Sequence, residues 1–158
     1  RGWPVALAAH LGIAAYQAEK RLSRPVHPLS GRRLGFTPEF AHVGALDDPV
    51  ALADLLMASA AVPPFMPVGR VGGRPALDGG LVDNVPVEPL EAIEAAGGKT
   101  LVLLTRRYPK LPEVANRTYA QPSRVIGVSQ FAIDDGEGIR AAYELGVADG
   151  EAFLRTMG

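Results

Sequence analysis

The sequence contains no cysteine, almost no net charge and no long apolar run. Without cysteine, neither a disulfide nor a thiolate zinc site can form. The formal net charge is −1, whereas nucleic-acid binding needs a basic face, so nucleic acid is not an expected partner. The apolar stretches fall short of the roughly 20 residues that span a membrane as a helix. A composition of 47% hydrophobic and 21% charged residues is typical of a globular protein.

The chain also shows no signal-peptide pattern and no initiator methionine, because it opens at Arg1. We therefore expect that residues upstream of Arg1 have been removed. A length of 158 residues suits one domain. Nothing in the sequence indicates a cellular compartment.

The order of helix and strand signals favours an α/β fold. Asp48 followed by Pro49 is a typical helix start, and Gly72-Gly73 is a typical hairpin turn. The sequence predicts helices over residues 4–22, 49–60, 87–97, 123–133 and 134–156, a strand or extended segment over 33–46, and a hairpin over 66–80.

The clearest strand signal is "KTLVLLTR", residues 99–106, which is almost continuously apolar. Such runs are typical of strands buried on both faces of a parallel sheet, and we expect the helices over 49–60 and 87–97 to pack on it. One such strand is too little sheet for the predicted helices. We therefore expect Val102 and Leu104 to have few partners within this chain, and part of the sheet to lie outside it.

Asp78 is the residue on which a functional interpretation depends, and it has two readings. It follows an apolar Pro75-Ala76-Leu77 and precedes Gly79-Gly80. Asp-Gly is among the strongest turn dipeptides, which makes Asp78 a turn residue. If Asp78 instead ends a strand, its carboxylate emerges at the sheet edge where α/β active sites lie. The dipeptide alone does not decide between them.

Other residues offer little catalytic chemistry. None of the five serines lies in a G-x-S-x-G nucleophile elbow, and "GVSQF" around Ser129 is only half of one. The histidines His10, His27 and His42 lack metal-ligand spacing and are expected to be surface or hydrogen-bonded structural groups. No metal and no cofactor is predicted.

Residues 58–90, "ASAAVPPFMPVGRVGGRPALDGGLVDNVPVEPL", resemble the second half of a patatin-like phospholipase. A helix ending in small residues leads into a proline-aromatic-proline turn, then a short hairpin, then Asp-Gly-Gly, then Asn-x-Pro. The matching residues are Ala58 to Ala61, Pro63, Phe65, Pro67, Asp78, Gly79, Gly80, Asn84 and Pro86. A looser likeness extends over residues 35–158, with 99–106 as the next core strand.

The resemblance implies the C-terminal part of a three-layer fold with a mainly parallel central sheet. It also implies a lipid acyl hydrolase with a Ser-Asp dyad, in which Asp78 takes the serine proton and later returns it. Gly79 and Gly80 would turn the chain away, and Asn84 would hold the loop by hydrogen bonds. The neighbouring Asp83 is expected to be a solvated loop acid.

The family's glycine-rich oxyanion loop and its nucleophile both lie upstream of the Asp segment and are not in this sequence. The expected partners are therefore a lipid or other ester substrate and the N-terminal half of the same domain. A peripheral contact with a membrane is compatible with this expectation. Two alternatives stay open: a non-catalytic binding or scaffold module of the same fold, and an unrelated α/β domain in which Asp78 only makes a turn.

Overall fold

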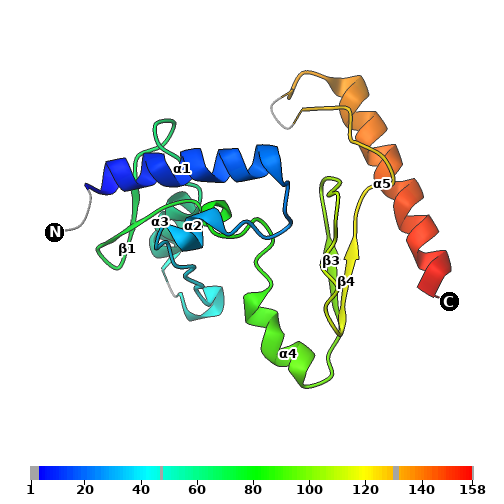
Figure 1. Cartoon of the computed structure of the whole chain (residues 1–158), viewed down its shortest axis with the longest axis horizontal. Coiled ribbons are helices and arrows are strands. Elements are labelled where there is room, and N and C mark those ends of the chain that lie inside the picture. Colours follow the sequence, from blue (N-terminus) through cyan, green and yellow to red (C-terminus); the bar gives the residue numbers. More distant parts are fainter. Residues whose placement is uncertain (1–3, 47, 130–131, 158) are drawn as a thin grey trace. The chain divides into compact units, whose positions relative to one another are not determined.

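The structure, a computed structural model, describes residues 4–46, 48–129 and 132–157. The chain divides into two compact units, Arg1–Pro89 and Leu90–Gly158, which we call the N-terminal and C-terminal units. Figure 1 traces the N-terminal unit from blue to green and the C-terminal unit from green to red. No described helix combines the length and the apolarity needed to cross a bilayer.

The N-terminal unit combines helices with one β-hairpin (Figure 1). The predicted helices near residues 4–22 and 49–60 are present, whereas the described part of the segment over 33–46 forms a 3₁₀ turn and no strand. The elements are α1 (Val5–Leu22), α2 (Ser30–Arg33), η1 (Val43–Ala45), α3 (Pro49–Ser59), β1 (Gly69–Val71), β2 (Arg74–Ala76) and η2 (Gly79–Leu81). The short helix η3 (Glu88–Leu90) leads into the second unit.

The start of α3 and the turn of the hairpin form as the sequence predicts, and neighbouring residues account for both. The carboxylate of Asp48 accepts the N–H of Val50 at 2.9 Å and caps α3. β1 and β2 pair in antiparallel register. Gly72 and Gly73 join them with φ angles of 56° and 77°, as a two-residue hairpin turn requires.

Small residues let the elements of this unit pack at backbone distance. Ala58 of α3 is buried. A Cβ atom built on Gly69 of β1 would lie only 2.5 Å from the Cα atom of Ala58. The glycine therefore lets the hairpin lie directly on α3. The buried apolar residues of the unit include Ala9, Val26, Ala58, Ala61, Leu81, Val82 and Val87.

The C-terminal unit holds a parallel strand pair and the long last helix (Figure 1). Its elements are α4 (Glu91–Ala95), β3 (Thr100–Leu103), β4 (Arg117–Ala120) and α5 (Gly136–Met157). The parallel pairing of β3 with β4 confirms the predicted strand direction. The described residues form two sheets of two strands each, so a three-layer fold is not confirmed. The predicted packing of α3 on this strand pair involves both units and stays a prediction.

The prediction for the faces of β3 is wrong. Val102 and Leu104 are buried, and the opposite face is open, with Leu101 and Leu103 exposed to 48% and 73%. A continuous apolar run indicates that either face of a strand can be buried. It does not indicate which of the two faces packs against another element. Among the described residues, β3 is covered on one side.

The prediction of a helix over 123–133 is also wrong, because the described residues of this segment form a loop. Residues 130–131 lie outside the described part of the chain. The segment has no packed apolar face, since Val125 is 76% exposed, and a short helix depends on such packing. The N–H of Ser123 donates to the Asp149 carboxylate at 2.9 Å. Nearby, the N–H of Tyr108 donates to the Gln121 side chain at 2.8 Å. The first bond ties the start of the segment to α5, and the second ties the residue Gln121, just before the segment, to the chain after β3.

A buried ion pair joins α4 to β4. Arg117 donates from Nε and Nη2 to the two oxygens of Glu94 at 2.8 and 2.6 Å, and the side chains are 5% and 7% exposed. Hydrogen bonds from Arg117 lower the pKa of the Glu94 carboxyl and outweigh burial, which acts in the opposite direction. Because both groups are out of water, each needs the other's charge.

We predict that Glu94→Gln destabilises the C-terminal unit at neutral pH. A carboxyl whose pKa is lowered by folding stabilises the fold above its unfolded pKa. The stabilisation therefore disappears as the pH falls below the ordinary value of 4.5. A urea titration followed by NMR at the β3 and β4 amides should show a lower midpoint for the variant at pH 7, and converging midpoints in acid.

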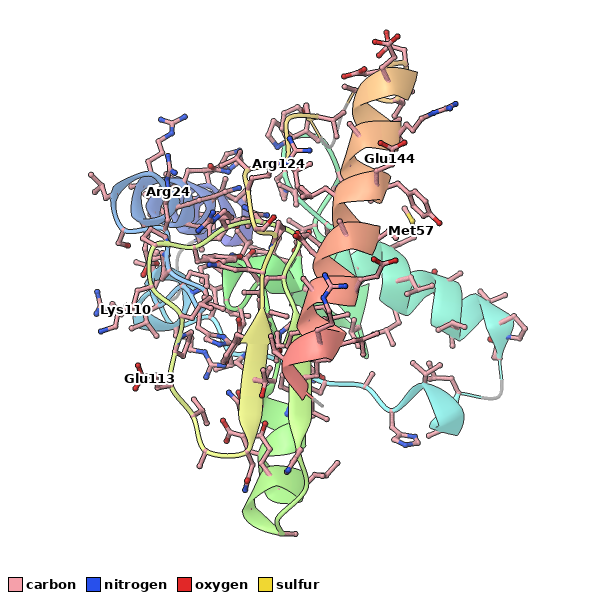
Figure 2. All side chains as sticks on the ribbon, turned by 90° about the vertical axis from the view of Figure 1, so that its right-hand side faces the viewer. Arg24, Met57, Lys110, Glu113, Arg124 and Glu144 are labelled. Carbon is pink, nitrogen blue, oxygen red and sulfur yellow. The ribbon has the colours of Figure 1, made fainter. Side chains whose placement is uncertain are left out.

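The matched control is Glu144→Gln, on the solvent side of α5 (Figure 2). It should leave the β3 and β4 midpoint unchanged. Equal midpoints for wild type and Glu94→Gln at pH 7 would contradict the prediction.

Candidate functional site

Asp78 begins the turn that follows the hairpin, two residues beyond the end of β2. Its N–H donates to the carbonyl of Ala61 at 3.0 Å. Its Oδ1 accepts the N–H of Gly80 at 2.7 Å and so caps η2. Of the two readings of Asp78, the expected strand end with its carboxylate at the sheet edge is therefore wrong: Asp78 lies beyond β2 and bonds within its own turn. An Asp two residues before a free N–H readily closes such a turn.

Gly80 brings two polar side chains to the same place. A Cβ atom on Gly80 would lie 2.9 Å from Oδ1 of Asp78 and 3.3 Å from Oδ1 of Asn84. Gly79, in contrast, has open space where its side chain would be. Gly80 is thus the glycine whose missing side chain lets the start and the end of the turn approach each other.

The middle of the turn packs against the backbone of α2. A Cβ atom on Gly31 would lie 2.1 Å from the carbonyl oxygen of Leu81. Leu81 and Val82 are both buried. Gly31 is therefore required for this contact, although no motif in the sequence singles it out.

Asn84 holds the end of the turn, as the sequence led us to expect. Its Oδ1 accepts the hydroxyl of Tyr16 at 2.9 Å. Tyr16 lies on α1, 68 residues earlier in the chain. Sequence reasoning missed this donor, since a lone tyrosine on a helix carries no signal for a distant partner.

Asp83 is not the solvated loop acid that was predicted. Its side chain is 10% exposed, and its two oxygens lie 2.9 and 3.1 Å from Nδ1 of His27. Oδ1 also accepts the N–H of Val85 at 2.9 Å. Asp83 therefore has a partner on the segment between α1 and α2, which a local reading of the turn could not reveal.

Glu19 fixes that segment to α1. Its carboxylate accepts the N–H of Leu29 at 3.0 and 3.1 Å and the N–H of Ser30 at 2.8 Å. Burial alone would raise the pKa of the Glu19 carboxyl, but these hydrogen bonds and the charge of Arg33 lower it overall. Glu19 thus stays ionised and holds the segment that carries His27 and Gly31.

The described residues offer no ready site for a metal, because no three of their His, Asp and Glu side chains gather as cation ligands. A cleft of about 270 Å³ lies along α3 and β1, lined by residues that include Met57, Met66 and Arg70. Figure 2 shows Met57 on α3. Asp78 is not among the lining residues.

The comparison with known families assigns the chain. The model of the family described as patatin-like phospholipase matches residues 8–91, more than half of the sequence. The chain therefore belongs to the patatin-like phospholipase family, a family of lipid hydrolases. No curated protein and no solved structure matches the chain.

The matched range differs from the resemblance that we expected. It begins upstream of residue 35 and takes in most of α1, all of α2 and the Asp-Gly-Gly turn, and it ends at 91, close to the end of the N-terminal unit. The looser likeness of β3 and α5 lies outside it. The alternative of an unrelated α/β domain is wrong, because the family match includes Asp78 and its surroundings.

We predict that Gly31→Ala destabilises the N-terminal unit by about 1–3 kcal/mol, the usual effect of forcing an extra carbon into a packed contact. The added methyl must push the Leu81 carbonyl away, so the turn shifts with it. Urea unfolding followed by NMR at the amides of residues 79–85 measures the effect.

Gly146→Ala is the matched control, because a Cβ atom there meets open space on α5. It should change the stability of its own helix by less than about 1 kcal/mol, in the stabilising direction. Unchanged amide midpoints at 79–85 in Gly31→Ala would show that the contact with Leu81 does not constrain the turn.

Proposed function

We propose that this chain supplies the catalytic aspartate of a lipid acyl hydrolase that works with a Ser-Asp dyad, and that Asp78 is this aspartate. The observation that carries the proposal is the family match over residues 8–91, which takes in the whole series from the small-residue end of α3 to Asn84. The substrate class is a lipid ester, since the family acts on lipids.

The reaction needs one group that takes and returns a proton. The serine Oγ attacks the ester carbonyl while its proton passes to Asp78. The tetrahedral adduct then collapses, the alcohol leaves with the proton from Asp78, and an acyl-serine remains. Water next gives a proton to Asp78 and attacks the acyl carbon, and Asp78 returns the proton to the serine as the carboxylic acid departs.

The turn geometry supports this role. The bond from the Gly80 N–H fixes Oδ1 of Asp78 at 2.7 Å, and Oδ2 accepts no hydrogen bond from the described residues. One oxygen thus orients the carboxylate and the other can take a proton. A turn-closing bond and a catalytic role are therefore compatible.

The nucleophile has to come from another segment. None of the five serines lies in an elbow, and no glycine-rich oxyanion loop is present in the sequence. We assign residues 1–158 to the C-terminal portion of one patatin-like domain, whose N-terminal half provides the serine and the oxyanion donors. A carboxylate is a weak base for an alcohol, so the donors and a water-poor site must stabilise the transition state.

In the enzyme that includes the nucleophile, Asp78→Asn should lower kcat by about 10³-fold or more, as loss of the base does in other nucleophile pairs. The turn should survive, because the asparagine oxygen can still accept the Gly80 N–H. Turnover of a p-nitrophenyl ester gives kcat, and circular dichroism checks the fold.

Asp48→Asn is the matched control. Asp48 caps α3 by the same kind of bond, at 2.9 Å to the Val50 N–H. The variant should keep wild-type kcat. An active, folded Asp78→Asn enzyme would return Asp78 to the role of a turn residue.

The chain of residues 1–158 by itself should not hydrolyse esters. Without the elbow and the oxyanion donors, of which a single donor is worth about 10²–10³ in rate, activity should fall below detection. Fluorophosphonate labelling and p-nitrophenyl ester turnover of the purified chain test this. Stoichiometric labelling of any of its five serines would contradict it.

A further inference from the structure

We infer that Tyr16 and His27 are positioning residues for the catalytic step, because they anchor the two consecutive side chains that end the Asp78 turn. The inference rests on the proposed role of Asp78. Neither residue belongs to the Asp-Gly-Gly or Asn-x-Pro pattern. They act through Asp83 and Asn84, and we use the name anchor pair for Tyr16 and His27.

The anchor pair reaches the turn from two different segments. Tyr16, on α1, donates its hydroxyl to Asn84 at 2.9 Å. His27, on the connection between α1 and α2, lies 2.9 Å from Asp83. Two adjacent side chains held by two different segments give the end of the turn a defined position.

Backbone bonds carry that position back to Asp78. The N–H of Asp83 donates to the carbonyl of Gly79 at 3.0 Å, and the N–H of Leu81 donates to the carbonyl of Asp78 at 3.1 Å. The side-chain oxygens of Asp78 and Asn84 both lie close to Gly80. A shift of residues 83–84 therefore displaces Gly79 and Gly80, and with them the N–H that orients Asp78.

The contact between α2 and the turn is made by backbone atoms, so no side chain can adjust to a shift of the turn. Gly31 meets the Leu81 carbonyl directly, and Glu19 ties the Gly31 segment to α1. The anchor pair and this contact share one framework, α1 with the segment after it. Losing one anchor should leave the turn folded but less well placed.

Loss of an anchor residue should lower kcat and leave KM little changed. A displacement of a catalytic group by about 1 Å can reduce the rate about 10²-fold while substrate binding is kept. In the enzyme that includes the nucleophile, Tyr16→Phe and His27→Leu should each lower kcat for a p-nitrophenyl ester by about 10–10²-fold with KM little changed. His27→Asn puts an amide N–H near the place of Nδ1 and should recover most of the loss.

The matched controls are Tyr143→Phe and His42→Leu, at exposed positions outside residues 78–85. Both should keep wild-type kcat. Amide hydrogen exchange at Gly80 and Val85, whose N–H groups donate to Asp78 and Asp83, gives a readout independent of activity. Exchange at these two amides should be faster in Tyr16→Phe and His27→Leu than in the controls. Asp83→Asn serves as the second variant if His27→Leu does not fold.

The outcomes separate the two proposals. If Asp78→Asn is inactive while Tyr16→Phe and His27→Leu keep full kcat, the positioning inference fails and the catalytic role of Asp78 stands. If Asp78→Asn is fully active, the proposed function fails. Equal losses of about 10³-fold or more in His27→Leu and His27→Asn would make His27 itself a proton-transfer group and overturn the inference.

Discussion

The N-terminal unit depends on a contact that no side chain mediates, the approach of Gly31 to the carbonyl of Leu81. A Cβ atom at Gly31 would lie 2.1 Å from that oxygen, so α2 and the turn lie backbone against backbone. The turn therefore takes its position from α1 and α2, and Tyr16 and His27 fix its end from α1 and from the connection that follows α1. An aspartate on a short turn can be held as firmly as one on a strand when its neighbours are held in this way.

Signals that depend on neighbouring residues were readable from the sequence. Asp48 caps α3, Gly72 and Gly73 turn the hairpin, and the strand over Thr100–Leu103 pairs in parallel, all as predicted. Predictions that depended on distant partners failed. The buried face of β3 was assigned wrongly because periodicity does not identify the partner. Residues 123–129 form a loop because their apolar side chains form no packed face, and Val125 is 76% exposed.

The same division holds for the candidate site. The spacing of Asp78, Gly80 and Asn84 is local, and the family match over residues 8–91 contains it. Tyr16 and His27 lie 68 and 56 residues before their partners, where sequence spacing carries no information. Asp83 was read as solvated for that reason, and only the fold shows that it is paired.

The most direct test of the central claim is a structure of the enzyme with its nucleophile covalently labelled by a fluorophosphonate. We predict that an oxygen of Asp78 lies about 2.6–3.2 Å from the labelled serine Oγ, the reach that proton transfer requires. We also predict that Tyr16 still donates to Asn84. A labelled serine whose nearest base is another residue, with Asp78 directed to solvent, would contradict the account.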